Sequence, residues 1–235
     1  MSGPLVRALL FDVFGTLVDW RTSIARDLSA FGARRSLSCD WIGLVDAWRG
    51  EYVPAMDRVR RGELPWRNLD ALHASSLDEL LPRFGLAELD ADDRAWIVRR
   101  WHALDPWPDV RAGLERLRAR HVLGTLSNGN VALLVDLCRN ADLRFDAIFS
   151  AEIFRRYKPD PQTYLGAAAL LGCEPHEVML VAAHNDDLGA ARAQGLRTAF
   201  VARPAEYGPH QRKDFAADAG VDVAARDLGK LADAL

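Results

Sequence analysis

Four short runs of apolar residues recur along the chain, and the first three end in clusters of polar residues or glycine. The runs are Leu5–Leu10 with its continuation to Phe14, His121–Leu126, Val178–Ala183 and Thr198–Ala202. Runs of this length that end in turn residues are typical of strands buried in a parallel sheet. Helical patterns lie between them, at Val110–Arg120, Val131–Asn140, Pro161–Leu171 and Leu188–Gln194. Alternating strands and helices predict βαβ units, so the expected fold is α/β with a doubly wound parallel sheet.

The stretch from Trp20 to Leu104 has helical periodicity and many charges, but no run that reads as a strand. Its helices are expected at Thr22–Phe31, Trp41–Arg61, Arg67–Phe84 and Asp92–Leu104. We therefore expect a helical insert that returns to the sheet through a rigid linker at Asp105–Pro108, because proline restricts the backbone. The chain then divides into a core of residues 1–18 and 106–235 and an insert of residues 19–105. The alanine-rich tail after Phe215 is expected to add a closing strand and helix.

The composition is that of an ordinary globular protein, with 49% hydrophobic and 27% charged residues among 235. The net charge of −3 argues against a polybasic nucleic-acid binder, and no apolar run approaches the ~20 residues of a membrane span. The first seven residues lack the pattern of a signal peptide. The three cysteines, Cys39, Cys138 and Cys173, form no C-x-x-C pair and suggest neither a disulfide framework nor a zinc site. We therefore expect a cytoplasmic protein with no nucleic-acid or membrane partner.

Polar clusters follow the strands of the predicted sheet. Asp12 follows the first strand, Ser127 and Asn128 follow the second, and His184–Asp187 follow the third, while Lys158 lies in a loop before a helix. A single cluster of this kind is more often a turn or a helix cap than a site. Because ligands bind beyond the carboxyl ends of the strands in open α/β sheets, several clusters at this edge predict a functional site.

Taken in order, these motifs resemble those of the haloacid dehalogenase (HAD) superfamily over the whole chain. The first is DVFGTL at Asp12, and the others are Ser127–Asn128, Lys158–Pro159 and His184–Asp187. The L-2-haloacid dehalogenase (type II) branch is the nearer resemblance. It rests on DVFGTLVDWR at Asp12, Trp48–Arg49, SNGN at Ser127 and YKPDPQTY at Tyr157. The resemblance implies a HAD-like, Rossmann-type core in which the helical insert is the cap domain.

Phe14 stands at a position of the first motif that separates two branches of this family. Phosphatases of the superfamily resemble D-x-D, in which the first carboxylate attacks phosphorus and the second acts as a general acid. A phenyl ring can neither donate a proton nor help to hold Mg²⁺, which prefers oxygen ligands. A departing halide needs no proton, so Phe14 favours a dehalogenase, for which the resemblance implies no metal and no cofactor.

The resemblance assigns the catalytic roles to five residues. Asp12 is the expected nucleophile, since a carboxylate can displace a leaving group from carbon and form an ester. Thr16 is expected to support the Asp12 carboxylate, and Lys158 is expected to keep it ionised. Asp187 aligns with the acidic residue that activates water or supports the network. Arg49 is expected to contact the substrate and assist the leaving group, against the alternative of a solvated helix arginine.

The expected substrate-binding residues are polar donors and aromatic side chains. Ser127 and Asn128 offer donors for the substrate carboxylate, or else form a plain turn. The aromatic residues expected to wall the pocket are Phe14, Trp20, Tyr52 and Trp66, although aromatics at helical spacing also pack in cores. Tyr164 is expected to hydrogen-bond into the network of Asp12 and Lys158, or else to pack in the core. The expected partner is therefore a small 2-substituted carboxylate. Relatives are often dimers, which leaves a homodimer open.

The fourth motif departs from the family pattern. Many relatives carry Ser-Ser-Asn where this chain reads Ala182-Ala183-His184-Asn185, so that His184 takes the amide position. A neutral His184 could donate to Asp12 or position water, or it could be a structural histidine. Both His184 and Asn185 are expected at the substrate-binding site, and the departure affects which leaving group is accepted.

The function we expect is hydrolytic conversion of a short 2-haloalkanoic acid into the 2-hydroxy acid through an aspartyl ester. Three alternatives stay open at this point. One is opening of a strained cyclic 2-amino acid of the azetidine-2-carboxylate type by the same mechanism, with Tyr52, His184 or water as the proton donor. The others are an Mg²⁺-dependent phosphatase and a non-catalytic binding protein on the same fold.

Overall fold

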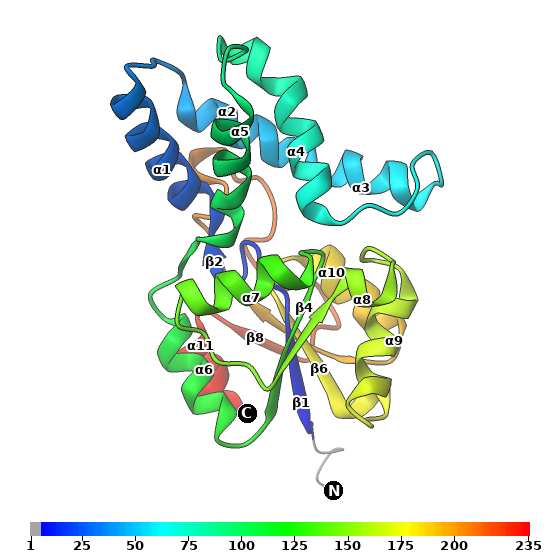
Figure 1. Cartoon of the computed structure of the whole chain (residues 1–235). Coiled ribbons are helices and arrows are strands. Elements are labelled where there is room, and N and C mark those ends of the chain that lie inside the picture. The colour runs from blue at the N-terminus through cyan, green and yellow to red at the C-terminus, as the bar shows by residue number, and fades with distance from the viewer. Residues whose placement is uncertain (1–5) are drawn as a thin grey trace, which may run out of the picture.

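A computed structural model describes residues 6–235 and contains a six-stranded, wholly parallel sheet in the order β5-β4-β1-β6-β7-β8 (Figure 1). The strands are β1 (Ala8–Phe11), β4 (Val122–Ser127), β5 (Ala147–Ser150), β6 (Val178–Ala182), β7 (Arg197–Val201) and β8 (Val223–Ala225). The four expected strands and the closing strand are present, which confirms the doubly wound α/β prediction; Leu5 lies outside the described residues. From β1 the chain first adds β4 and β5 on one side and then β6, β7 and β8 on the other. The topological switch point therefore lies between β1 and β6.

Helices cover both faces of this sheet and bury the alternating side chains of its strands. Leu9 and Phe11 of β1 pack on the face that carries α6, α7 and α11, whereas Leu10 packs on the face that carries α9 and α10. The bounds are α6 (Val110–Arg118), α7 (Val131–Asn140), α8 (Ala151–Phe154), α9 (Pro161–Leu170), α10 (Asn185–Ala193) and α11 (Leu228–Ala234), with 3₁₀ turns at Pro175–Glu177 and Gly208–His210. All core helices expected from the sequence are present.

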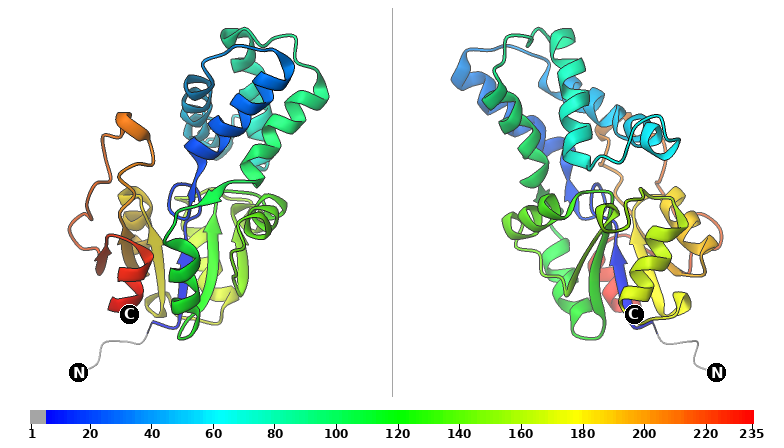
Figure 2. Two further views of the ribbon diagram at one scale, coloured as in Figure 1. Left: turned by 90° about the vertical axis from the view of Figure 1, so that its left-hand side faces the viewer. Right: turned by 45° about the vertical axis from the view of Figure 1, so that its right-hand side comes forward.

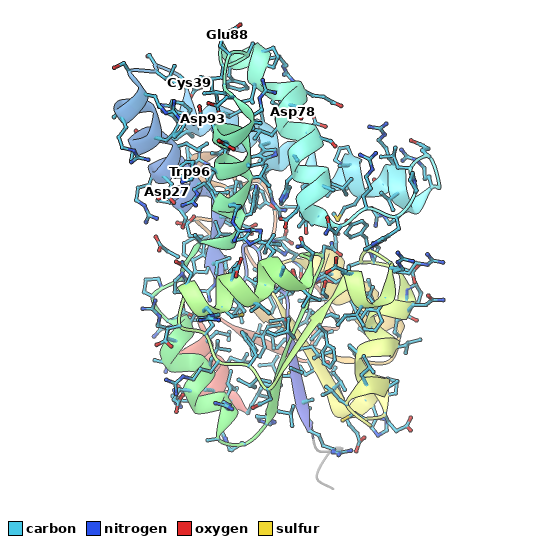
Figure 3. All side chains as sticks on the ribbon, in the orientation of Figure 1. Asp27, Cys39, Asp78, Glu88, Asp93 and Trp96 are labelled. Atoms are coloured by element: carbon cyan, nitrogen blue, oxygen red, sulfur yellow. The ribbon has the colours of Figure 1, made fainter. Side chains whose placement is uncertain are left out.

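The insert is helical throughout and stands above the carboxyl ends of the strands (Figure 1). It contains α1 (Trp20–Arg35), α2 (Trp41–Gly50), α3 (Tyr52–Arg60), α4 (Leu69–Leu80) and α5 (Ala91–Val98), with 3₁₀ turns at Leu81–Phe84 and Arg99–His102. Trp96 of α5 stacks on Phe31 of α1 with ring centroids 5.2 Å apart, and Asp93 pairs with Arg35; Figure 3 labels Trp96 and Asp93. The helices of the cap therefore pack against one another, and their buried apolar side chains are continuous with the core on one face of the sheet.

The cap contains a break that the sequence pattern does not predict. One helix was expected over Trp41–Arg61, but the structure has two helices that meet at Glu51. Pro54 has no N–H to donate to the carbonyl of Gly50, so a continuous α-helical ladder cannot form here. The break allows α2 to present Arg49 and α3 to present Tyr52 to the same cavity.

The two ends of the cap lie side by side at the junction with the core. The expected linker forms β3 (Asp105–Pro106), which pairs antiparallel with β2 (Val18–Asp19). Beyond this ribbon, the backbone N–H of Trp107 donates to Leu17 at 3.0 Å. The linker is thus a short strand rather than a loop, and it fixes where the cap leaves and re-enters the core.

One core strand, β5, was not predicted from the sequence. It contains only four residues, and its first two, Ala147 and Ile148, are half-buried, so its apolar signal is short. In residues 6–235, no helix is long and apolar enough to cross a membrane.

Candidate active site

Asp12 lies one residue beyond β1, at the carboxyl end of a central strand. Its backbone N–H donates to Val181 of β6 at 3.0 Å, so the residue stays in register with the sheet. The chain then turns through Gly15, whose φ of +83° favours glycine. A Cβ at Gly15 would lie 2.1 Å from the Glu206 carboxylate, so close approach also requires glycine here. The turn therefore holds Asp12 at the carboxyl edge of the sheet and brings Glu206 close to Gly15.

The Asp12 carboxylate is buried and receives three partners. Lys158 Nζ lies 2.9 Å from Oδ1, Thr16 Oγ1 donates to Oδ2 at 2.7 Å, and His184 Nδ1 lies 3.2 Å from Oδ2. Burial works to raise the pKa of Asp12, but the cationic partners and the hydroxyl outweigh it and hold the pKa well below its usual value. Asp12 is therefore a buried, ionised carboxylate.

Lys158 bridges two carboxylates. Its Nζ donates to Asp12 and also to Asp187 Oδ2 at 2.5 Å, while Tyr164 donates its hydroxyl to Asp187 Oδ1 at 2.7 Å. Burial works to lower the pKa of Lys158, but the two carboxylates raise it above its usual value. The backbone N–H of Lys158 donates to Asn128 Oδ1 at 2.8 Å, which ties two of the predicted motifs together.

His184 lies between Asp12 and a second buried carboxylate. Its Nε2 is 2.9 Å from Glu206 Oε2, and Trp20 donates its indole N–H to Glu206 Oε1 at 3.1 Å. Burial works to lower the pKa of His184, but Glu206 and Asp12 raise it well above its usual value. Burial likewise works to raise the pKa of Glu206, but His184 holds it below its usual value. The pair is an imidazolium and a carboxylate.

Arg49 reaches the site from the cap. Its guanidinium carbon lies 4.1 Å from the centroid of the Tyr52 ring, and its Nη2 lies 4.0 Å from Glu206 Oε1. Nη1 is buried and has no hydrogen-bond partner among the residues that the structure describes. An unpartnered N–H of a buried cation is costly for folding, so Arg49 offers a donor to an anionic ligand.

These side chains line one cavity of about 330 Å³ between the cap and the core. Nine of the residues predicted for the site line it, namely Asp12, Phe14, Arg49, Tyr52, Asn128, Lys158, Tyr164, His184 and Asp187. Thr16 lies behind Asp12, to which it is bonded. The charged groups and the aromatic walls are thus brought together from both the core and the cap.

Four other predicted residues do not line this cavity. Ser127 accepts from the backbone N–H of Gly129 at 3.1 Å, so it shapes its own loop. Asn185 donates to Asp214 and Ala216 at 3.1 and 2.9 Å. Trp66 packs against Tyr157 with ring centroids 4.8 Å apart, and the buried Trp20 supports Glu206. Polar turn residues can bond to neighbouring backbone instead of to a ligand, and large aromatics pack in cores.

Several residues of the site were missed by the sequence analysis. One of them is Glu206, which bonds to His184. The others line the cavity: Val53, Met56, Arg60, Pro159, Asp186, Tyr207 and Lys213. Glu206 lies in the segment after β7, which rises from the edge of the sheet to the height of the cap (Figure 2). The rule that found Asp12, a polar residue beyond the carboxyl end of a parallel strand, applies to Glu206 as well.

The donors around Asp12 do not fit a magnesium ion. Its nearest partners are an ammonium, an imidazole and a hydroxyl, and Phe14 supplies no oxygen. Among residues 6–235, no group of three or more His, Cys, Asp or Glu side chains is arranged to hold a metal.

The fold and the site together define a class of hydrolases. In this class an α/β core carries a carboxylate at the topological switch point of its sheet, and a helical cap covers that carboxylate. The chain belongs to the haloacid dehalogenase-like hydrolases, since the model of that family matches residues 6–195.

The chain is similar to several haloacid dehalogenases. It is 32% identical over 217 residues to (S)-2-haloacid dehalogenase 4A of Burkholderia cepacia, covering 86% of this chain and 87% of that one. The crystal structure of the L-2-haloacid dehalogenase PA0810 matches with a TM-score of 0.95 and 52% identity, covering 97% of both chains. The defluorinating L-2-haloacid dehalogenase Rha0230 matches with a TM-score of 0.95 and 46% identity, over 98% and 95% of the two chains. Phosphoglycolate phosphatases also match, for example that of Nitrosospira multiformis at 25% identity over 91% of this chain and 89% of that one.

Proposed function

We propose that this protein hydrolyses the carbon–halogen bond of short 2-haloalkanoic acids and releases the 2-hydroxy acid. One observation carries the proposal: an ionised Asp12 and a buried Arg49 with an unpartnered N–H line the same cavity. The site thus combines a nucleophile for carbon with a donor for an anion. The similarity to (S)-2-haloacid dehalogenases supports the same assignment.

In the first step, Asp12 attacks C2 of the substrate from the face opposite the halogen. The Asp12 O–C2 bond forms as the carbon–halogen bond breaks, and the halide leaves with the bonding electron pair. Inversion at C2 follows from this geometry. Arg49 stabilises the charge of the departing halide, while Phe14, Tyr52 and Met56 supply an apolar surface around C2. Asn128 faces the same cavity and binds the substrate carboxylate.

In the second step, water attacks the carbonyl carbon of the Asp12 ester. Asp187 lines the cavity and takes the proton of the attacking water. The water oxygen enters Asp12, whereas the original Asp12 oxygen leaves with the product. One water proton ends on the product hydroxyl, and the other reaches solvent as Asp12 returns to its ionised form.

The core and the cap have different tasks in this proposal. Residues 1–18 and 106–235 supply the nucleophile and its cations, and residues 19–105 supply Arg49 and Tyr52. The cavity between them accommodates a small acid rather than a nucleic acid. The homodimer and the cytoplasmic location stay predictions, and sedimentation would test the homodimer.

A second candidate is opening of a strained cyclic 2-amino acid such as azetidine-2-carboxylate. The observation that favours it is the His184 imidazolium, whose Nδ1 lies 3.2 Å from Asp12. A departing ring nitrogen needs a proton, and an imidazolium beside the nucleophile can donate it. A departing halide needs no proton donor. The two candidate reactions therefore differ in whether His184 must protonate the leaving group.

A substrate panel tests the proposal. It contains the two enantiomers of 2-chloropropionate, fluoroacetate, azetidine-2-carboxylate and an aryl phosphate, and it is assayed by ion chromatography and mass spectrometry. Halide release from one 2-chloropropionate enantiomer, with the inverted lactate as product, is the expected result. Ring opening without halide release would favour the cyclic amino acid. Cleavage of the phosphate alone, dependent on Mg²⁺, would replace the proposal by a phosphatase.

A further inference from the structure

The two oxygens of the Asp12 carboxylate have different partners. Oδ1 faces Lys158 alone, at 2.9 Å, whereas Oδ2 receives the Thr16 hydroxyl at 2.7 Å and faces His184 Nδ1 at 3.2 Å. Oδ1 therefore has fewer bonds to give up when it attacks carbon. If Oδ1 carries the new ester bond, Oδ2 becomes the carbonyl oxygen and keeps the hydrogen bond from Thr16, with His184 Nδ1 3.2 Å away.

The direction of the Thr16 hydrogen bond is fixed by its surroundings. The backbone N–H of Ala183 donates to Thr16 Oγ1 at 2.9 Å, so the hydroxyl proton is free to point toward Asp12 Oδ2. The backbone carbonyl of Thr16 also accepts from Arg203 Nε at 2.9 Å. Arg203 begins the turn that carries Glu206, since the N–H of Glu206 donates to the Arg203 carbonyl at 3.1 Å. The loop of Thr16 and the turn of Glu206 are therefore anchored to one another.

His184 is held at both ring nitrogens by carboxylates. A neutral imidazole carries one N–H and can donate to only one of them, whereas an imidazolium donates to both. Asp12 lies on one side and Glu206 on the other, at 3.2 and 2.9 Å. Glu206 is 1% exposed, and Trp20 holds its second oxygen. Glu206 thus provides a fixed negative charge behind the ring.

We propose that Thr16 and His184 form the oxyanion hole for hydrolysis of the Asp12 ester, and that Glu206 is the positioning residue that keeps His184 protonated and oriented. This inference rests on the proposed function. When water adds to the ester carbonyl carbon, the electron pair of the C=O bond moves to Oδ2, which becomes an oxyanion. The Thr16 hydroxyl and the His184 N–H already lie at hydrogen-bond distance from that oxygen, so little reorganisation is needed. Collapse of the intermediate restores the C=O bond and breaks the bond from the carbonyl carbon to Oδ1, which leaves with the product.

Formation of the ester also changes the charge around His184. In the free enzyme, Asp12 and Glu206 both favour the imidazolium, while Lys158 and Arg49 oppose it from behind the two carboxylates. The phenols of Tyr52 and Tyr207 and the Asp186–Lys213 ion pair also line this cavity. Esterification removes the charge of Asp12, so in the intermediate Glu206 is the remaining carboxylate that faces the ring. Its contribution is therefore largest in the second chemical step.

His184 could act as a charged hydrogen-bond donor or as a base, and these two roles predict opposite effects of pH on the rate of ester hydrolysis. If His184 is the donor, hydrolysis of the ester slows as the pH rises and the ring loses its proton. If a neutral His184 removes the proton of water, hydrolysis of the ester accelerates over the same range. In the Glu206→Gln variant, the pKa of His184 falls. If His184 is the donor, the pH range in which ester hydrolysis slows should therefore move to lower pH.

The experiment is a rapid-quench single turnover of the full protein with 2-chloropropionate across a range of pH. Chloride reports ester formation, and the mass of the intact protein reports the lifetime of the ester. We expect Glu206→Gln to retain rapid chloride release and to prolong the ester by roughly tenfold, which corresponds to ~1.4 kcal/mol. Trp20→Phe, which removes one hydrogen bond to Glu206, is expected to retain chloride release and to prolong the ester by less. Glu88→Gln, the same substitution at an exposed position of the cap, is the matched control.

The possible outcomes separate the inference from the proposed function. If the unaltered protein releases no chloride, the proposed function is overturned. Chloride release followed by the same ester lifetime and pH profile in Glu206→Gln, Trp20→Phe and the unaltered protein overturns the inference alone. Faster decay of the ester with rising pH overturns the donor role of His184 in favour of the base.

Discussion

Lys158 places its ammonium 2.9 Å from the Asp12 carboxylate, and both side chains are buried. The ion pair joins the end of β1 to a loop nearly 150 residues further along the chain. A buried carboxylate without a cation would take up a proton and lose its nucleophilicity. Lys158 therefore determines the pH range in which Asp12 can attack carbon.

Replacing Lys158 by methionine should raise the pKa of Asp12 and move the acid limb of the kcat/KM profile to higher pH. Loss of one partner of a buried ion pair also destabilises a protein by roughly 3–5 kcal/mol. The measurements are pH–rate profiles and chemical denaturation. Lys230→Met, an exposed lysine in α11, is the control. An unchanged acid limb in a folded Lys158→Met variant would contradict the role of Lys158.

Arg49→Ala should lower kcat/KM by more than tenfold with little change in melting temperature. A hydrogen bond from a charged group is worth roughly 1.5–3 kcal/mol, and each 1.36 kcal/mol corresponds to about tenfold in rate. Among residues 6–235, Nη1 of Arg49 has no hydrogen-bond partner, so the substitution removes no hydrogen bond at that nitrogen. Arg49→Lys should recover part of the activity, because lysine lacks the planar fork. Arg61→Ala, in an exposed pair with Glu63, is the control, and equal kinetics in the two alanine variants would remove Arg49 from the site.

The source of the product oxygen distinguishes a covalent intermediate from direct attack by water. In a single turnover with excess protein in heavy-oxygen water, we expect unlabelled product and label in the peptide that contains Asp12. Over many turnovers the product should become labelled. Mass spectrometry of product and peptide makes the measurement. Direct attack by water instead predicts label in the product of the first turnover and an unlabelled peptide.

Activity on 2-haloacids should survive exhaustive treatment with EDTA. The reason is that the positive charge beside Asp12 comes from Lys158, and Phe14 offers no oxygen to a metal. Steady-state rates before and after chelation, with and without added Mg²⁺, provide the measurement. Loss of activity that Mg²⁺ restores would overturn this prediction.

A histidine at the boundary of cap and core should make stability depend on pH. The buried ring of His102 lies 2.8 Å from Asp136 of α7 and 3.1 Å from Asp70 of α4, while Arg99 also pairs with Asp136. Burial works to lower the pKa of His102, but the two carboxylates raise it above its usual value. A raised pKa in the folded state stabilises below the unfolded value near 6.5, and this contribution is lost as the pH rises through the folded value.

The free energy of unfolding should therefore fall between neutral and alkaline pH by more in the unaltered protein than in His102→Asn. Urea denaturation at several pH values measures this difference. Comparing the two proteins also removes the contribution of His184, which has the same sign. Parallel pH dependences in the two proteins would show that His102 does not stabilise the junction.

The central strands could be predicted from the sequence because strands buried on both faces read as continuous apolar runs. Asp12 and Lys158 were found because several motifs occur together in the order typical of the haloacid dehalogenase superfamily, although each motif alone is weak evidence. The short edge strand β5 and the break at Glu51 could not be found in this way. Half-buried residues give a weak apolar signal, and the helical periodicity of Trp41–Arg61 continues across Pro54, although the backbone hydrogen bonds do not.

The sequence by itself determined the class of fold, the helical insert and the residue types available at the carboxyl edge of the sheet. Only the tertiary structure decided which of those side chains face the cavity. Ser127 and Asn128 are neighbours, yet Ser127 bonds within its own loop while Asn128 lines the cavity. The charge of His184 depends on Glu206, 22 residues away, and Trp20 and Arg49 of the cap contact Glu206 in turn. Hydrogen bonding and electrostatics act over a few ångströms in space, and those distances exist only once the chain has folded.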